Sequence, residues 1–144
     1  MSSYADTSIF APLYLQESTS AAAQGALAVL AEPLPLIPLG MLELRNALNL
    51  AIVRERITEA ERDVAWARFQ AHLAAGTYTE TPIPATELHA KARELSDRYT
   101  PTLATRSLDL LHVAAATLLG AKVFYSFDER QRKAAAGEGL KVKP

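Results

Sequence analysis

Short apolar runs alternate with longer segments of helical periodicity along the whole chain, and this alternation restricts the possible folds more than any other feature of the sequence. The runs that predict strands cover residues 2–5, 35–39, 77–83, 122–127 and 140–143. Apolar residues at helical spacing predict helices between them, over residues 9–15, 21–30, 41–56, 58–76, 85–99, 108–119 and 128–136. Strands that alternate with helices favour an α/β layer fold, in which a short, mostly parallel central sheet of about five strands has helices on both faces.

Capping residues mark the starts of two of these helices. Thr58 is followed three residues later by Glu61, which is the spacing of a capping box. Ser107 is expected to cap the helix over residues 108–119. We find no internal repeat, low-complexity tract or linker between the elements, so we expect one domain over residues 1–144.

The composition excludes several classes of protein. The chain has no cysteine, which rules out zinc ribbons, iron–sulfur clusters, thiol catalysis and a disulfide-stapled secreted scaffold. The reducing cytoplasm is therefore the expected compartment. With 15 basic and 16 acidic residues, the formal net charge is −1, which argues against a protein that coats duplex nucleic acid through bulk charge.

Residues 25–42 are almost entirely apolar and could be mistaken for a membrane span. Pro33, Pro35 and Pro38 each remove an amide donor, and Glu32 would lie in hydrocarbon without a partner. We therefore expect the end of a helix at Pro33, then a loop and a buried strand, and no interaction with a membrane. The N-terminal residues also lack the pattern of a secretory signal.

Four carboxylates are placed where an α/β fold forms its sites. Asp6 follows the first expected strand, Asp128 follows the strand at 122–127, and Glu43 and Asp109 are expected in first helical turns. All four can meet at the carboxyl edge of a parallel sheet. Like charges so close together repel unless a hard cation neutralises them, and oxygen ligands favour Mg²⁺ or Mn²⁺. The chemistry that such a site suits is phosphodiester hydrolysis.

Each of these acids also has a purely structural interpretation. Asp6 and Asp128 are well placed as helix N-caps, and Asp128 has Gln131 three residues later. Asp109 and Glu43 would suit the positive end of a helix dipole. The spacing of the acids alone leaves both interpretations open.

Four segments follow one another in the order YADTSIF, MLELRNAL, RSLDLLHVAAATLLGAK and VFYSFDERQRKAA. In this order and spacing they resemble the PIN-domain ribonucleases, in particular the VapC-type toxins of prokaryotic toxin–antitoxin systems. The resemblance covers essentially the whole chain and is most specific from residue 106 to residue 142. It implies a PIN-like three-layer α/β/α fold with a short central sheet flanked by helices.

The resemblance also implies an activity and its site. The family's acidic cluster maps onto Asp6, Glu43, Asp109 and Asp128, and the implied reaction is cleavage of RNA by an endonuclease that requires Mg²⁺ or Mn²⁺. Ser126 stands where family members commonly have threonine, and its hydroxyl is kept. A cognate antitoxin and a homodimer are the implied protein partners.

Other polar residues near the acids are supporting candidates. The hydroxyls of Thr7 and Ser126 can hydrogen-bond a metal-bound water or a phosphate, or can cap the backbone. Four arginines flank the acids and can bind RNA phosphates or form solvated surface: Arg45, Arg106, Arg130 and Arg132. We interpret His112 as a packed helix residue near the site rather than as a general base.

Three functions remain open from the sequence. The first is a toxin that cleaves RNA, the second is a PIN-domain ribonuclease in RNA processing without an antitoxin, and the third is a PIN-like binding module without turnover. Apolar residues in the first half of the chain are expected to form part of a dimer or antitoxin interface: Leu27, Val29, Leu30, Leu48 and Ile52. The reading frame next to the gene would discriminate the first two functions.

Overall fold

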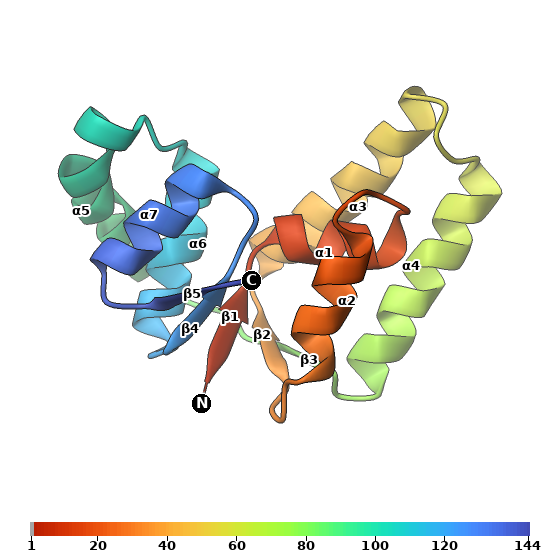
Figure 1. Cartoon of the computed structure of the whole chain (residues 1–144), viewed down its shortest axis with the longest axis horizontal. Helices are drawn as coiled ribbons and strands as arrows, with labels where there is room; N and C mark the ends of the chain where they lie inside the picture. Colours follow the sequence, from red (N-terminus) through yellow and green to blue (C-terminus); the bar gives the residue numbers. More distant parts are fainter. Residues whose placement is uncertain (1) are drawn as a thin grey trace.

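The computed structural model describes residues 2–144, in which strands and helices alternate in the expected order (Figure 1). The strands in this range are β1 (Ser3–Ala5), β2 (Leu34–Leu36), β3 (Tyr78–Glu80), β4 (Val123–Tyr125) and β5 (Lys141–Lys143). The helices are α1 (Thr7–Tyr14), α2 (Ser20–Ala28), α3 (Pro38–Val53), α4 (Glu59–Ala74), α5 (Ala85–Leu103), α6 (Ser107–Leu118) and α7 (Glu129–Gly137).

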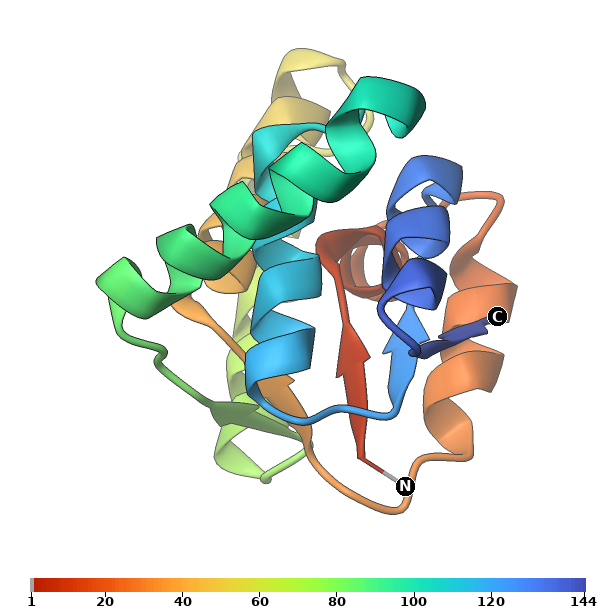
Figure 2. The same cartoon turned by 90° about the vertical axis from the view of Figure 1, so that its left-hand side faces the viewer.

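Three layers build the molecule (Figures 1 and 2). Helices α1 to α4 lie on one side of the strands and α5 to α7 lie on the other, so the three-layer α/β/α architecture is confirmed. Each helical layer has its own hydrophobic core against the sheet. Leu48 and Phe69 are fully buried in the α1–α4 core, and Leu95 and Val113 are fully buried in the α5–α7 core.

All strand pairs are parallel, and the ladders fall into two groups. In one, β4 lies between β1 and β5; in the other, β2 pairs with β3. Strand β1 packs beside β2 without a ladder between them in residues 2–144. The expected five short, parallel strands are therefore confirmed, and they form hydrogen-bonded groups of three and two.

Side chains of β1 and β4 alternate between the two cores, as the pleat of a strand requires. Ala5 and Tyr125 face the α1–α4 core, whereas Tyr4 and Phe124 face the α5–α7 core and stack on each other with ring centroids 5.7 Å apart. The phenol of Tyr4 is thereby directed toward α6.

Several expected helix boundaries differ in the structure, and three of them bear on caps or on the site. Helix α2 ends at Ala28, before Pro33 is reached. Helix α3 begins at Pro38, because proline suits the first turn, and Glu43 consequently lies in the second turn rather than the first. Helix α6 begins at Ser107 itself, with Arg106 as its N-cap, so Ser107 is not the cap.

The capping box at the start of α4 is confirmed. The Thr58 hydroxyl accepts a hydrogen bond from the Glu61 amide at 3.1 Å, and the Glu61 carboxylate accepts one from the Thr58 amide at 3.0 Å. The apolar segment over residues 25–42 divides into the end of α2, a loop, β2 and the start of α3. Across residues 2–144, no helix is both long enough and apolar enough to cross a bilayer.

Candidate active site

The acidic residues gather at the carboxyl edge of the strands. Asp6 directly follows β1 and is the N-cap of α1, and Asp128 is the N-cap of α7, the helix that follows β4. Asp109 lies in the first turn of α6, which runs back along the sheet and starts at the same edge. Helix N-termini carry partial positive charge, which favours carboxylates there.

Asp6 is the most buried of the acids, with 5% of its surface exposed. Its Oδ1 accepts a hydrogen bond from the Ser8 hydroxyl at 2.6 Å and makes no cap to the helix backbone. Burial raises the pKa of Asp6 to about 6, and the negative charges of Asp109 and Glu43 add to the rise, whereas the Ser8 hydrogen bond and His112 oppose it. Asp6 therefore shares its electrostatic environment with two of the other three acids.

Glu43 reaches this edge from α3 and is held by two side chains. The Thr7 hydroxyl donates to Glu43 Oε1 at 3.0 Å, and His112 Nε2 forms a hydrogen bond with the same oxygen. His112 is buried on α6, and its Nδ1 lies 2.7 Å from the hydroxyl of Tyr4. His112 is thus packed next to the site, as expected, but it also binds one of the acids directly.

Arg106 joins the remaining two acids. Its Nε is 3.0 Å from Asp109 Oδ2 and its Nη2 is 3.6 Å from Asp128 Oδ2, while 69% of the arginine side chain stays exposed. The hydrogen bond and the charge of Asp109 raise the pKa of Arg106, and the charges of Asp128 and Glu43 contribute. Asp128 also accepts from the Gln131 amide at 2.8 Å, so the capping interpretation holds for this residue.

A chain of hydroxyl and amide groups connects the loops around the acids. Ser126 donates to Gln131 Oε1 at 2.7 Å and accepts from the Asp128 amide at 3.0 Å. Gln131 Nε2 donates to the main-chain oxygen of Asp109 at 3.1 Å, and Ser8 accepts from the Phe127 amide at 2.9 Å. The turns after β1 and β4 and the start of α6 are therefore fixed to one another.

The four candidate arginines lie in different surroundings. Arg106 contacts two of the acids. The exposed Arg130 donates to the main-chain oxygen of Ala104 at 3.3 Å, and Ala104 lies two residues before Arg106. Arg132 donates to the main-chain oxygen of Ser126 at 2.9 Å, and Arg45 lies over the ring of Trp66 at 5.1 Å from its centroid. Of these four, only Arg106 forms a contact with the acidic cluster in residues 2–144.

Sequence reasoning missed the roles of Tyr4 and Gln131 and underestimated His112. Tyr4 stands two residues before Asp6, and His112 stands three residues after Asp109 on the same helix. These spacings put each residue on the same face as an acid, which is a usable signal. The contact of His112 with Glu43 joins α6 to α3, and no local spacing indicates it.

The oxygen atoms that the four acids offer are the type of ligand that a hard divalent cation prefers. All four acids offer carboxylate oxygens, and Asp6 lies in the negative field of Asp109 and Glu43, which a cation would offset. Within residues 2–144, no three acidic or histidine side chains are already arranged around a common metal position. Arg106 supplies the positive charge near Asp109 and Asp128 in this arrangement.

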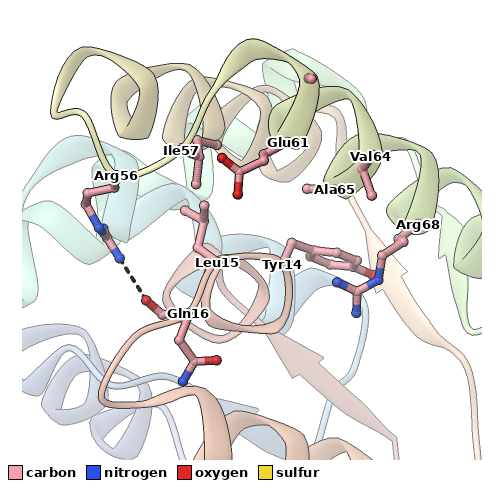
Figure 3. Close-up of a pocket in the computed structure, with 10 residues that line it drawn as sticks. Tyr14, Leu15, Gln16, Arg56, Ile57, Glu61, Val64, Ala65 and Arg68 are labelled. Atoms are coloured by element: carbon pink, nitrogen blue, oxygen red, sulfur yellow. Dashed lines mark hydrogen bonds between the residues drawn. The ribbon is translucent and has the colours of Figure 1, made fainter.

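A separate groove of about 460 Å³ lies between the end of α1 and the first half of α4 (Figure 3). Leu15, Ile57 and Val64 contribute apolar surface to it, and none of the four acids lines it. Arg56 stands on one side and donates to the main-chain oxygen of Gln16 at 3.0 Å. The groove is therefore distinct from the acidic cluster.

Comparisons with known proteins identify the family. The structure is similar to that of VapC20 from Mycobacterium tuberculosis, described as a sarcin–ricin loop cleaving toxin, with a TM-score of 0.73, 19% identity and coverage of 99% of this chain and 100% of that one. It is also similar to FitAcB from Neisseria gonorrhoeae, with a TM-score of 0.70, 15% identity and coverage of 99% and 96%. The comparison with curated proteins gives no match. The family model described as "PIN domain" matches residues 3–137, and the chain therefore belongs to the PIN-domain family.

Proposed function

We propose that this protein is an endoribonuclease that depends on Mg²⁺ or Mn²⁺ and acts as the toxin of a type II toxin–antitoxin pair. The observation that carries the proposal is the shared electrostatic environment of Asp6, Glu43 and Asp109 at the carboxyl edge of the strands, in a chain of the PIN-domain family. The likeness to VapC20, described as a sarcin–ricin loop cleaving toxin, supports the proposed substrate class.

In this proposal the four carboxylates of Asp6, Glu43, Asp109 and Asp128 hold the cation directly or through water. When bound, a divalent cation lowers the pKa of a coordinated water and offsets charge on the scissile phosphate. The chain's own residues orient the ligands: Ser8 holds Asp6, and Thr7 holds Glu43.

The exposed guanidinium of Arg106 lies beside the acids, and that of Arg130 lies beside Ala104, two residues before Arg106; both are suited to bind the RNA backbone. A single-stranded loop can present its backbone to a recessed acidic site, whereas a regular A-form helix does so poorly. We therefore expect cleavage in loops of structured RNA.

A cleavage assay with Asp109→Asn tests the proposed chemistry. Wild-type protein should cleave structured RNA when Mg²⁺ or Mn²⁺ is present and stop when a chelator is added. Asp109→Asn should lose at least ~10²-fold in rate, the scale typical of removing one preorganised electrostatic group. Asp97→Asn, which removes the same charge from an exposed position on α5, should cleave like the wild type. Equal rates for wild type and Asp109→Asn at saturating metal would refute the assignment of Asp109.

Exposed apolar surface on α3 and α4 supports the proposal that the protein binds an antitoxin and a second copy of itself. Of the residues first expected at an interface, Leu48 is fully buried, whereas Val29 is 74% exposed. Further exposed apolar side chains on this side of the sheet are Leu42, Leu50 and Val53 on α3 and Val64 on α4. Of these, Val64 lines the groove of Figure 3. We propose that an antitoxin segment occupies this groove and that a second copy of the chain covers part of the remaining apolar surface.

The toxin role is tested in cells and in solution. Expression of the wild type should arrest growth, Asp109→Asn should not, and co-expression of the protein from the neighbouring reading frame should restore growth. Light scattering at tens of micromolar should give the mass of a dimer. Cleavage without growth arrest or rescue would instead favour RNA processing.

A further inference from the structure

Resting on the proposed function, we propose that Tyr4 and His112 are positioning residues: together they fix the orientation of the Glu43 carboxylate for the cation. The three residues come from different elements, β1, α6 and α3, and form one continuous hydrogen-bonded relay. Neither Tyr4 nor His112 touches the cation or the RNA in this proposal.

The relay is buried at its inner end and open at its outer end. Tyr4 has 1% of its surface exposed and His112 has 2%, whereas the Glu43 side chain is 24% exposed. A buried imidazole with both ring nitrogens bonded has a fixed ring orientation, because rotation would break both hydrogen bonds at once. The orientation of the Glu43 carboxylate is therefore set by its hydrogen bond to the buried His112 ring.

The direction of the hydrogen bonds follows from the acceptor at the open end. A carboxylate oxygen accepts, so His112 Nε2 carries the imidazole proton and donates it to Glu43 Oε1. Nδ1 of the neutral ring is then the acceptor, and the buried Tyr4 hydroxyl, 2.7 Å away, donates to it.

Both donors to Glu43 bind the same oxygen. His112 Nε2 and the Thr7 hydroxyl converge on Oε1, the latter at 3.0 Å. Oε2 is consequently the oxygen available to a cation. Partners of this kind around a ligating carboxylate typically change metal affinity by 10-fold to 100-fold when they are removed.

The chain contains a matched control for the relay. Tyr14 bonds His72 Nδ1 at 2.6 Å and Tyr78 at 2.8 Å, in the α1–α4 core and away from the acids. Removing the Tyr14 hydroxyl breaks a tyrosine–histidine hydrogen bond of nearly the same length without touching Glu43. An effect on metal binding that is specific to Tyr4 and His112 therefore separates positioning from general stability.

Two substitutions of His112 distinguish its ring nitrogens. The amide nitrogen of glutamine lies near the position of Nε2, so His112→Gln keeps a donor for Glu43. The amide nitrogen of asparagine lies near the position of Nδ1, so His112→Asn does not. By calorimetric titration with Mn²⁺, His112→Asn should bind at least about 10-fold more weakly than the wild type. His112→Gln should stay much closer to the wild type, Tyr4→Phe should bind more weakly, and Tyr14→Phe should bind like the wild type.

A spectroscopic arm checks the relay without metal. Long-range ¹H–¹⁵N correlation spectra of the chelator-treated protein should show the His112 proton on Nε2, and Tyr4→Phe should reduce the preference for that tautomer. A proton fixed on Nδ1, or Mn²⁺ binding by His112→Asn that equals the wild type, overturns the inference and leaves the proposed nuclease standing. Absence of Mn²⁺ binding by the wild type overturns the proposed function, and the positioning role with it.

Discussion

At the scale of single residues, Asp6 combines deep burial with neighbouring negative charge. Its carboxyl group stays protonated in the folded chain up to a pKa of about 6, compared with 3.8 for the unperturbed group. Between these two pH values the folded state binds more protons than the unfolded state, so the free energy of unfolding falls as the pH rises. Above pH 7 the loss is on the order of 3 kcal/mol.

Asp6→Asn is therefore expected to stabilise the metal-free protein at neutral pH. Asparagine keeps an acceptor for the Ser8 hydroxyl, which bonds Asp6 Oδ1 at 2.6 Å, and removes the buried charge. In chelator, the melting temperature of the variant should exceed that of the wild type at pH 7.5, and the difference should shrink as the pH falls toward 4. Asp97→Asn serves as the control for net charge. A difference that does not change with pH would contradict the raised pKa.

Arg106 places a positive charge beside the acids that would bind a divalent cation. Because its Nε is 3.0 Å from Asp109 Oδ2, the guanidinium repels a cation held by the same carboxylate. Arg106→Gln should therefore bind Mn²⁺ more tightly, by about fivefold or less, since exposed ion pairs contribute about 1 kcal/mol at most. Arg45→Gln, which removes a charge that lies over Trp66, is the control. Weaker Mn²⁺ binding by Arg106→Gln would mean that the arginine organises the acids instead of repelling the cation.

The sequence predicts the positions of the acids better than their contacts. Asp6 and Asp128 follow strands, and parallel strands deliver such residues to one edge, so their proximity is predictable from order alone. The pairing of Tyr4 with His112 joins residues 108 positions apart and depends on how α6 packs over β1. No propensity or spacing encodes that distance.

At the scale of elements, helix boundaries were predicted within a few residues, and two of the differences lie at prolines. Pro38 opens α3 earlier than expected, because its missing amide is not needed in the first turn. Pro101 lies inside the last turn of α5, which continues to Leu103 instead of stopping at residue 99. The split of the strands into two hydrogen-bonded groups depends on the spacing of β1 and β2, which a sequence pattern does not fix.

Two helical glycines should respond in opposite directions to alanine. A Cβ on Gly137, at the end of α7, would overlap the Tyr99 hydroxyl, whereas a Cβ on Gly25, in α2, would meet nothing within 4 Å. Gly137→Ala should destabilise by about 1–3 kcal/mol, because Tyr99 has to move away from Glu138, its partner at 2.5 Å. Gly25→Ala should stabilise by roughly 0.5–1 kcal/mol. Urea unfolding measures both, and a stable Gly137→Ala would show that Tyr99 can move freely.

At the scale of the whole molecule, metal binding and folding are linked, because the acids belong to α1, α3, α6 and α7 and the preceding turns. A ligand that binds only the folded state stabilises it by about 2.7 kcal/mol at ~100 times its Kd. Mg²⁺ at that level should raise the melting temperature of the wild type above its value in chelator. Asp109→Asn should gain less, and Asp97→Asn should gain as much as the wild type. A full shift in all four acid variants would indicate that Mg²⁺ binds elsewhere.

The pairing of β1 with β4 has a consequence for how the protein is made. Strand β1 leaves the ribosome before its ladder partner, Val123–Tyr125, which is synthesised more than a hundred residues later. Asp128 follows still later, together with the Phe127 amide that holds Ser8. The proposed nuclease therefore cannot assemble its four acids until β4 and Asp128 have been synthesised, and a product that terminates before β4 carries neither a complete sheet nor a complete set of acids.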